Sequence, residues 1–145
     1  VLDIGSGGGF PSIPIIIFRP DLTFKLAESN RKKASFLKEV GKELSLKNFS
    51  VYNGKAENLY SSEERFDYII SRGFGSLQKF SQIAKPLLNK DGHMYTFKTK
   101  QFTTELDFIT NNKDKDGVKI CEIAEYDLGN LISGLNLVSL ELVRG

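Results

Sequence analysis

The chain alternates short apolar runs with segments in which apolar residues recur every three or four positions. The apolar runs, each expected to form a strand, lie at residues 1–5, 23–28, 49–53, 66–71 and 92–99. The periodic segments, expected to form helices, lie at residues 13–18, 31–44, 77–87 and 103–111. Such alternation is typical of βαβ units, whose strands are parallel.

Two of the expected helices have a capping side chain in front of them. Asn30 precedes a helix with one apolar face, and Ser76 precedes another. The two expected faces consist of Phe36, Leu37, Val40 and Leu44, and of Leu77, Phe80, Ala84 and Leu87. After the helix at 103–111, the polar stretch Asn112–Gly117 predicts an exposed turn.

The end of the chain departs from the alternation. Two apolar-rich runs, 118–127 and 137–143, are joined by a loop that contains Gly, Asn and Ser, and they predict an antiparallel hairpin. The expected fold is therefore α/β: a doubly wound, mostly parallel seven-stranded sheet with a C-terminal antiparallel hairpin, in one domain over residues 1–145. Ligands of such sheets bind beyond the carboxyl ends of the strands.

A glycine-rich turn follows the first strand directly. Its glycines include Gly5, Gly7 and Gly9, with Asp3 ahead of them. A dinucleotide fingerprint would need a third glycine where Phe10 stands, and no phosphate-loop Lys-Ser/Thr follows. The spacing instead resembles the first motif of class I S-adenosylmethionine (SAM)-dependent methyltransferases, which implies a Rossmann-like fold and a role for Asp3 near the methionine end of the cofactor. The alternative is a tight turn that binds no ligand.

Two further acidic positions follow strands. Glu28 ends the second strand nineteen residues after Gly9, where nucleoside-binding sheets carry a carboxylate for the ribose hydroxyls. Its alternative role is a surface charge at a strand end. After the third strand, the small Ala56 is followed by Glu57, and this pair could line an adenine pocket.

Further stretches of the chain make the resemblance specific to one family. The chain resembles the glucose-inhibited division protein B family, the bacterial small-subunit rRNA guanine-N7 methyltransferases, in stretches at 3–12, 27–37, 54–59, 71–77 and 97–98. The resemblance implies that Gly5 and Phe10 contact the cofactor, that Ala56 and Glu57 flank its adenine, and that Arg72 lies beside the methyl-transfer centre. It also implies an N-terminal helical segment ahead of residue 1.

The chain departs from the family pattern at a few positions. The family commonly has Asp at the position of Glu28, Ala at those of Gly73 and Gly75, and Gly at that of Thr99. These differences affect the fine geometry of the loop after the fourth strand and leave the carboxylate after the second strand in place.

The residues after the fourth strand favour guanine N7 as the methyl acceptor. That strand ends in Ser71-Arg72-Gly73-Phe74, without the Asn/Asp-Pro-Pro-Tyr/Phe box of enzymes that methylate exocyclic amines. N7 carries a lone pair and no proton, so we expect no general base, and a positioning role for Arg72. Arg72 could contact guanine O6, an RNA phosphate or the cofactor carboxylate, or form a structural ion pair.

The single cysteine and the single histidine are not expected to be catalytic. Cys121 lacks the preceding proline of cytosine-C5 methyltransferases, so a small core residue is expected there. His93 follows Asp91-Gly92 and is expected in a turn. With one cysteine, no internal disulfide and no metal site are expected.

Charge and composition add expectations about partners. The net charge is +2, so an RNA site would depend on local clusters, for which the candidates are Lys32, Lys55, Lys98 and Lys100. No signal peptide or membrane span is visible, and a monomer in the bacterial cytoplasm is expected, with small-subunit rRNA or the 30S subunit as partner. The alternatives are a methyltransferase of a small molecule or protein, a non-catalytic SAM-binding ribosome-assembly protein, and a nicotinamide oxidoreductase.

Overall fold

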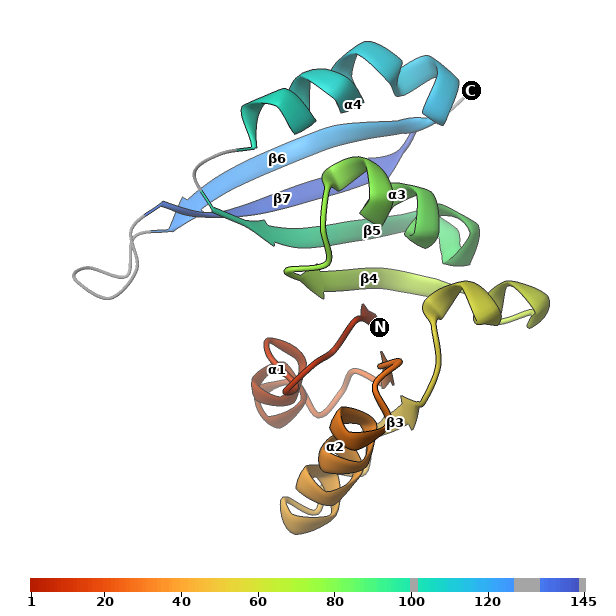
Figure 1. The fold of residues 1–145 in the computed structure, drawn as a ribbon, viewed down its shortest axis with the longest axis vertical. Coiled ribbons are helices and arrows are strands. Elements are labelled where there is room, and N and C mark those ends of the chain that lie inside the picture. The colour runs from red at the N-terminus through yellow and green to blue at the C-terminus, as the bar shows by residue number, and fades with distance from the viewer. Residues whose placement is uncertain (100–101, 127–133, 144–145) are drawn as a thin grey trace. The chain divides into compact units, whose positions relative to one another are not determined.

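The structure of this protein is a computed structural model, which describes residues 1–99, 102–126 and 134–143. It consists of two compact units, Val1–Glu64 and Arg65–Gly145, each described by itself below (Figure 1). Within the described ranges, no helix has both the length and the apolar character needed to cross a membrane.

The first unit contains three parallel strands in the order β3-β2-β1. Its elements are β1 (Leu2–Ile4), α1 (Ser12–Phe18), β2 (Phe24–Ala27), α2 (Arg31–Glu43), β3 (Phe49–Tyr52) and the 3₁₀ helix η1 (Ala56–Ser61). Ile4 pairs with Ala27, and Ala27 pairs with Tyr52, so the three strands end in one row. The turns that follow them therefore begin at the same edge of the sheet.

Helix α2 begins as predicted but buries a different face. The Asn30 side chain accepts hydrogen bonds from the backbone N–H groups of Lys32 and Lys33, which confirms the predicted cap. Phe36 and Leu44 are exposed, however, and the buried residues are Ala34, Leu37 and Gly41. Small residues face the sheet because the helix lies very close to it: a Cβ on Gly41 would come within 1.8 Å of the Phe49 ring.

The second unit contains four strands in the order β4-β5-β7-β6. Its elements are β4 (Phe66–Arg72), α3 (Leu77–Ala84), the 3₁₀ helix η2 (Lys85–Leu87), β5 (Leu88–Lys98), α4 (Thr103–Asp116), β6 (Val118–Tyr126) and β7 (Leu135–Leu142). Strands β4 and β5 are parallel, whereas β7 is antiparallel to both β5 and β6. The predicted fold class, a mostly parallel seven-stranded sheet with a C-terminal antiparallel hairpin, is confirmed.

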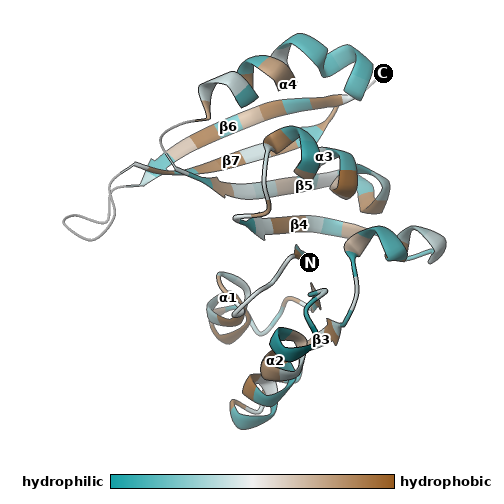
Figure 2. Ribbon diagram, viewed as in Figure 1, coloured by the Kyte–Doolittle hydropathy of each residue, from teal (hydrophilic) through white to brown (hydrophobic). Residues whose placement is uncertain are grey.

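The two long helices of the second unit differ in how well the sequence predicted them. The predicted apolar face that begins at Leu77 is confirmed, because all four of its residues are buried. Helix α4 is longer than predicted: it continues to Asp116, so the turn expected at 112–117 is wrong. Figure 2 shows α4 as largely hydrophilic. Its buried residue is Ile109. Lys113 and Lys115 favour a helix C-terminus, and Gly117, at φ +66°, ends the helix.

The loop after β1 is packed tightly at one glycine and lies open at its neighbour. Gly9 is buried at φ +87°, and a Cβ there would come within 2.5 Å of the Ile13 side chain and 3.0 Å of Leu37. Gly8 is exposed, and a Cβ on it would meet nothing within 4 Å. Gly9 therefore allows the loop to pack against α1 and α2, whereas Gly8 makes no such contact.

We predict that Gly9→Ala destabilises the protein by about 2–5 kcal/mol, since left-handed backbone costs roughly 1–2 kcal/mol and overpacking roughly 1–3 kcal/mol. Gly8→Ala is the matched control, with an expected effect within about 0.5 kcal/mol. Urea denaturation of both variants measures the difference. Equal midpoints for the two variants would contradict the packing assigned to Gly9.

Candidate functional site

In the glycine turn after β1, every second residue is a glycine with a left-handed backbone conformation. Gly5, Gly7 and Gly9 have φ values of +73°, +55° and +87°, which side chains with a Cβ rarely adopt. The Gly9 N–H donates to the Ser6 carbonyl at 2.8 Å and closes the turn. A Cβ on Gly7 would meet only the Gly5 carbonyl oxygen, at 3.8 Å. The turn is therefore open at Gly7, where a ligand can approach the backbone.

Glu28 connects the three loops at this edge. Its residue is only 7% exposed, and one carboxylate oxygen accepts the Gly7 N–H at 2.8 Å while the other accepts the Asn30 N–H at 2.7 Å. Its backbone carbonyl accepts the Gly54 N–H at 3.1 Å, after the end of β3. An ionised carboxylate has about four acceptor positions, so two remain for ligand hydroxyls. From the sequence, Glu28 was predicted to bind a ligand, but its hydrogen bond to the glycine turn was not predicted.

Asp3 accepts hydrogen bonds from two serines, one in the glycine turn and one after it. It is buried within β1, and its carboxylate accepts a hydrogen bond from the Ser12 hydroxyl, the first residue of α1, at 2.6 Å. Its backbone carbonyl accepts the Ser6 hydroxyl at 3.1 Å. Asp3 therefore binds residues near both ends of the glycine turn.

The segment after β3 carries the two residues predicted for an adenine pocket. Ala56 is buried and Glu57 half-buried in the first turn of η1. The Asn53 side-chain amide donates to the Glu28 carbonyl at 2.9 Å. Phe10, predicted to contact the cofactor, ends the glycine turn and is 57% exposed. The first unit thus places Phe10, Glu28 and the glycines in loops that leave one sheet edge.

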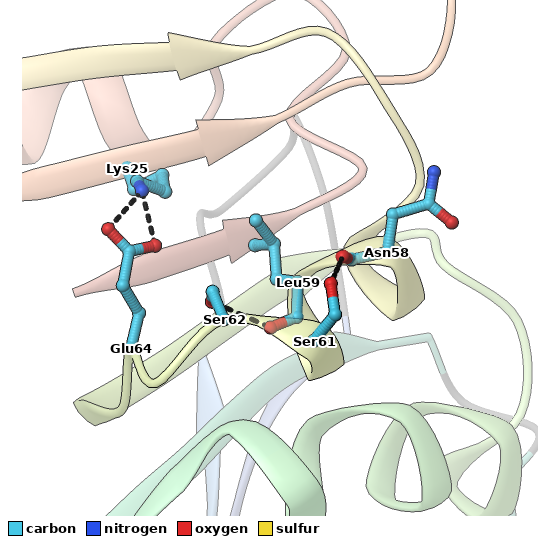
Figure 3. A network of polar contacts seen from close by, with 6 residues as sticks. All are labelled: Lys25, Asn58, Leu59, Ser61, Ser62 and Glu64. Atoms are coloured by element: carbon cyan, nitrogen blue, oxygen red, sulfur yellow. Dashed lines mark hydrogen bonds and ion pairs between the residues drawn. The ribbon is translucent and has the colours of Figure 1, made fainter.

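The far end of η1 is tied to the sheet as well (Figure 3). The Ser62 hydroxyl donates to the Leu59 carbonyl at 2.7 Å, and the Ser61 hydroxyl to the Asn58 carbonyl at 3.2 Å. Beyond them, Glu64 forms an ion pair with Lys25 of β2. The segment that carries Ala56 and Glu57 is therefore held to the strands both before and after η1.

The second unit carries the remaining predicted residues at the ends of β4 and β5. Arg72 is the exposed last residue of β4. In the strand register it lies opposite Phe97, which directly precedes Lys98 in β5. Beyond Arg72, Phe74 is half-buried, with the Lys79 ammonium 5.5 Å from its ring centroid. The structure thus brings Arg72 and Lys98 to the same edge of this unit.

The lysines predicted to bind RNA have different surroundings. Lys32, at the start of α2, and Lys55, before η1, are exposed. The Lys98 side chain is only 12% exposed, pairs with Glu105 at 2.7 Å and donates a hydrogen bond to the Gly75 carbonyl. Lys100 lies outside the described residues.

His93 and Cys121 do not lie where the sequence predicted. His93 is inside β5, opposite Glu141 of β7, and not in a turn. Cys121 is exposed, not in the core, and lies at a bulge of β6. Desolvation of the sulfur and the nearby Glu141 carboxylate raise the pKa of the Cys121 thiol, which lowers its thiolate fraction and makes it a weaker nucleophile.

These residues form a group that the sequence did not predict. Ligand atoms of His93, Cys121 and Glu141 all lie within 4.8 Å of one another, so within the described ranges they could hold a metal ion. One oxygen of Glu141 already pairs with Lys119 at 2.7 Å, and this hydrogen bond lowers the pKa of Glu141. The strand register creates the group, and we assign it no part in the candidate site.

The fold of the chain is similar to that of solved structures. A putative methyltransferase from Thermoplasma acidophilum matches with a TM-score of 0.73 at 11% identity, over 99% of this chain and 67% of that one. M. jannaschii TYW2, solved in complex with AdoMet, matches with a TM-score of 0.67 at 18% identity, over 96% of this chain and 65% of that one. At these identities the likeness establishes the fold alone.

Sequence comparison is more specific. The chain is 36% identical, over 98% of its length, to ribosomal RNA small subunit methyltransferase G of Chromobacterium violaceum, and 41% identical, over 73% of its length, to that of Legionella pneumophila strain Corby. It spans 65% and 50% of the lengths of these relatives. Residues 1–129 match the model of the GidB family, described as rRNA small subunit methyltransferase G, and the chain belongs to that family.

Proposed function

We propose that this chain is the SAM-binding domain of a methyltransferase that acts on N7 of a guanine in small-subunit (16S) rRNA. The observation that carries the proposal is the buried Glu28 carboxylate bound to an open glycine turn. The description of the GidB family supports the RNA substrate. The AdoMet bound in the structure of M. jannaschii TYW2, which has the same fold, supports the cofactor.

The residues of the first unit fit SAM. Two acceptor positions of the Glu28 carboxylate suit the two hydroxyls of a ribose. Gly7 leaves space in which a ligand can approach the backbone. The start of η1, with the buried Ala56 and the half-buried Glu57 carboxylate, is proposed to flank the adenine. In this proposal Asp3 and Gly9 shape the turn, and Gly5 and the exposed Phe10 contact the ligand.

The proposed chemistry needs no proton transfer by the protein. SAM supplies a methyl group on a positively charged sulfur. The N7 lone pair forms a bond to the methyl carbon, the carbon–sulfur bond breaks with its electrons on sulfur, and the positive charge moves to the guanine. The work left to the residues is to hold the reacting atoms in line and to exclude competing geometries, which can supply up to about 7–11 kcal/mol.

Arg72 is the residue we propose to place beside the acceptor base. It is exposed at the end of β4, and a guanidinium can donate to guanine O6 or to a phosphate. The exposed Lys32 and Lys55 are proposed to bind RNA phosphates, which position the substrate without reading its sequence. The proposed partner is small-subunit rRNA or the 30S subunit, and the proposed setting is a monomer in the bacterial cytoplasm.

The reaction is tested with labelled SAM and 30S subunits from a bacterial strain that lacks this methylation, with the full-length protein as enzyme. We expect label in the 16S rRNA, at a guanine whose N7 methylation makes the chain cleavable by borohydride and aniline. Label in ribosomal protein or in a small molecule would contradict the RNA substrate. Saturable SAM binding without transfer would indicate a non-catalytic protein instead.

We predict that Glu28→Gln weakens SAM binding at least about tenfold, although the side chain keeps its size. An amide has one acceptor oxygen, so its NH₂ group would face the N–H of either Gly7 or Asn30 and leave that donor unpaired. Isothermal titration calorimetry measures the affinity. Glu63→Gln, at an exposed position of the same unit, is the control. An unchanged affinity of Glu28→Gln would refute the proposed ribose site.

A further inference from the structure

The loop between β4 and α3 has little rigidity of its own. It comprises residues 73–76, and both Gly73 and Gly75 have positive φ, +70° and +112°. A Cβ on Gly73 would meet nothing within 4 Å. Glycine loses more conformational entropy on ordering than any other residue. A fixed position of this loop, which follows Arg72 directly, therefore depends on contacts from outside it.

Two charged side chains from other elements supply such contacts. The Lys98 ammonium, at the end of β5, donates to the Gly75 carbonyl and lies 2.7 Å from a carboxylate oxygen of Glu105. The same oxygen of Glu105, in the first turn of α4, accepts the Leu77 N–H at 2.6 Å. Backbone groups on both sides of Ser76 are thereby held by one ion pair.

The burial of the pair distinguishes it from an ordinary surface ion pair. The Lys98 and Glu105 side chains are 12% and 26% exposed. An exposed pair contributes little, but a shielded pair is costly to break, since the partner left behind keeps an uncompensated charge. To reach an RNA phosphate, Lys98 would have to leave both Glu105 and the Gly75 carbonyl. These contacts favour a structural partner for Lys98 over a phosphate.

We propose that Lys98 and Glu105 form a clamp on the loop 73–76, and that Lys98 is a positioning residue for Arg72 and Phe74 rather than an RNA ligand. The effect on methyl transfer rests on the proposed function. The clamp itself is a property of the second unit and can be measured without any substrate.

The first experiment measures amide hydrogen exchange in the full-length protein. In Lys98→Met and in Glu105→Met we expect exchange at Leu77 to accelerate about tenfold or more, because Glu105→Met removes the acceptor of the Leu77 N–H and Lys98→Met releases the Glu105 side chain from the ion pair. The double variant is expected to accelerate exchange little beyond either single one, since the two residues act as a unit. Lys90→Met, at an exposed position of the same strand, is the control. Unchanged exchange in both single variants would overturn the clamp.

The second experiment separates positioning from RNA binding. For Lys98→Met we expect kcat to fall about tenfold or more, with KM for 30S subunits unchanged. The slope of log affinity against log salt should also stay unchanged, whereas loss of a phosphate contact lowers its magnitude by about one. Lys98→Arg, which can still pair with Glu105, should recover part of kcat. A raised KM, unchanged kcat and a reduced slope would make Lys98 an RNA ligand and overturn the proposal.

The two experiments fail in distinguishable ways. If hydrogen exchange accelerates as expected but the unaltered protein transfers no methyl group, the clamp stands and the proposed function falls. If the unaltered protein methylates rRNA but neither exchange nor kcat changes in the Lys98 variants, the proposed function stands and the clamp falls.

Discussion

The candidate site depends on one buried carboxylate. Glu28 accepts an N–H from the turn after β1 and another from the start of α2, and its backbone carbonyl accepts a third from the turn after β3. Three loops that would otherwise be independent are thus all hydrogen-bonded to a single residue. A charge this deeply buried is tolerable because both oxygens have donors. The loops around the candidate site are thus fixed by contacts within the first unit itself.

Local rules of the chain predicted the fold, the glycine turn and the helix caps well. The glycine spacing, the carboxylate after β2 and the caps at Asn30 and Ser76 are each set by residues close together in sequence. Helix periodicity alone did not predict which side of α2 is buried, because that depends on how closely the helix approaches Phe49. The end of α4 was missed because charged residues suit both an exposed turn and a helix C-terminus, and Gly117 decides between them.

Contacts between residues far apart along the chain were not predicted from the sequence. Lys98 has the position of a candidate RNA ligand at the end of a strand, and only the approach of Glu105 from α4 reveals its internal partner. His93 and Glu141 are far apart along the chain but are opposite each other in the register of β5 and β7, and the bulge in β6 brings Cys121 to them. No pattern of residue types predicts such a register.

Asn30 connects Glu28 to the start of α2. The backbone N–H of Asn30 is bound by Glu28, while its side chain caps α2. The reach of the carboxylate therefore sets the separation between the glycine turn and the helix start. An aspartate at position 28, shorter by one methylene, would have to draw both donors inward to keep both bonds. The length of this one side chain therefore acts as a spacer, and an exchange of the two acids at this position would require the start of α2 or the glycine turn to move as well.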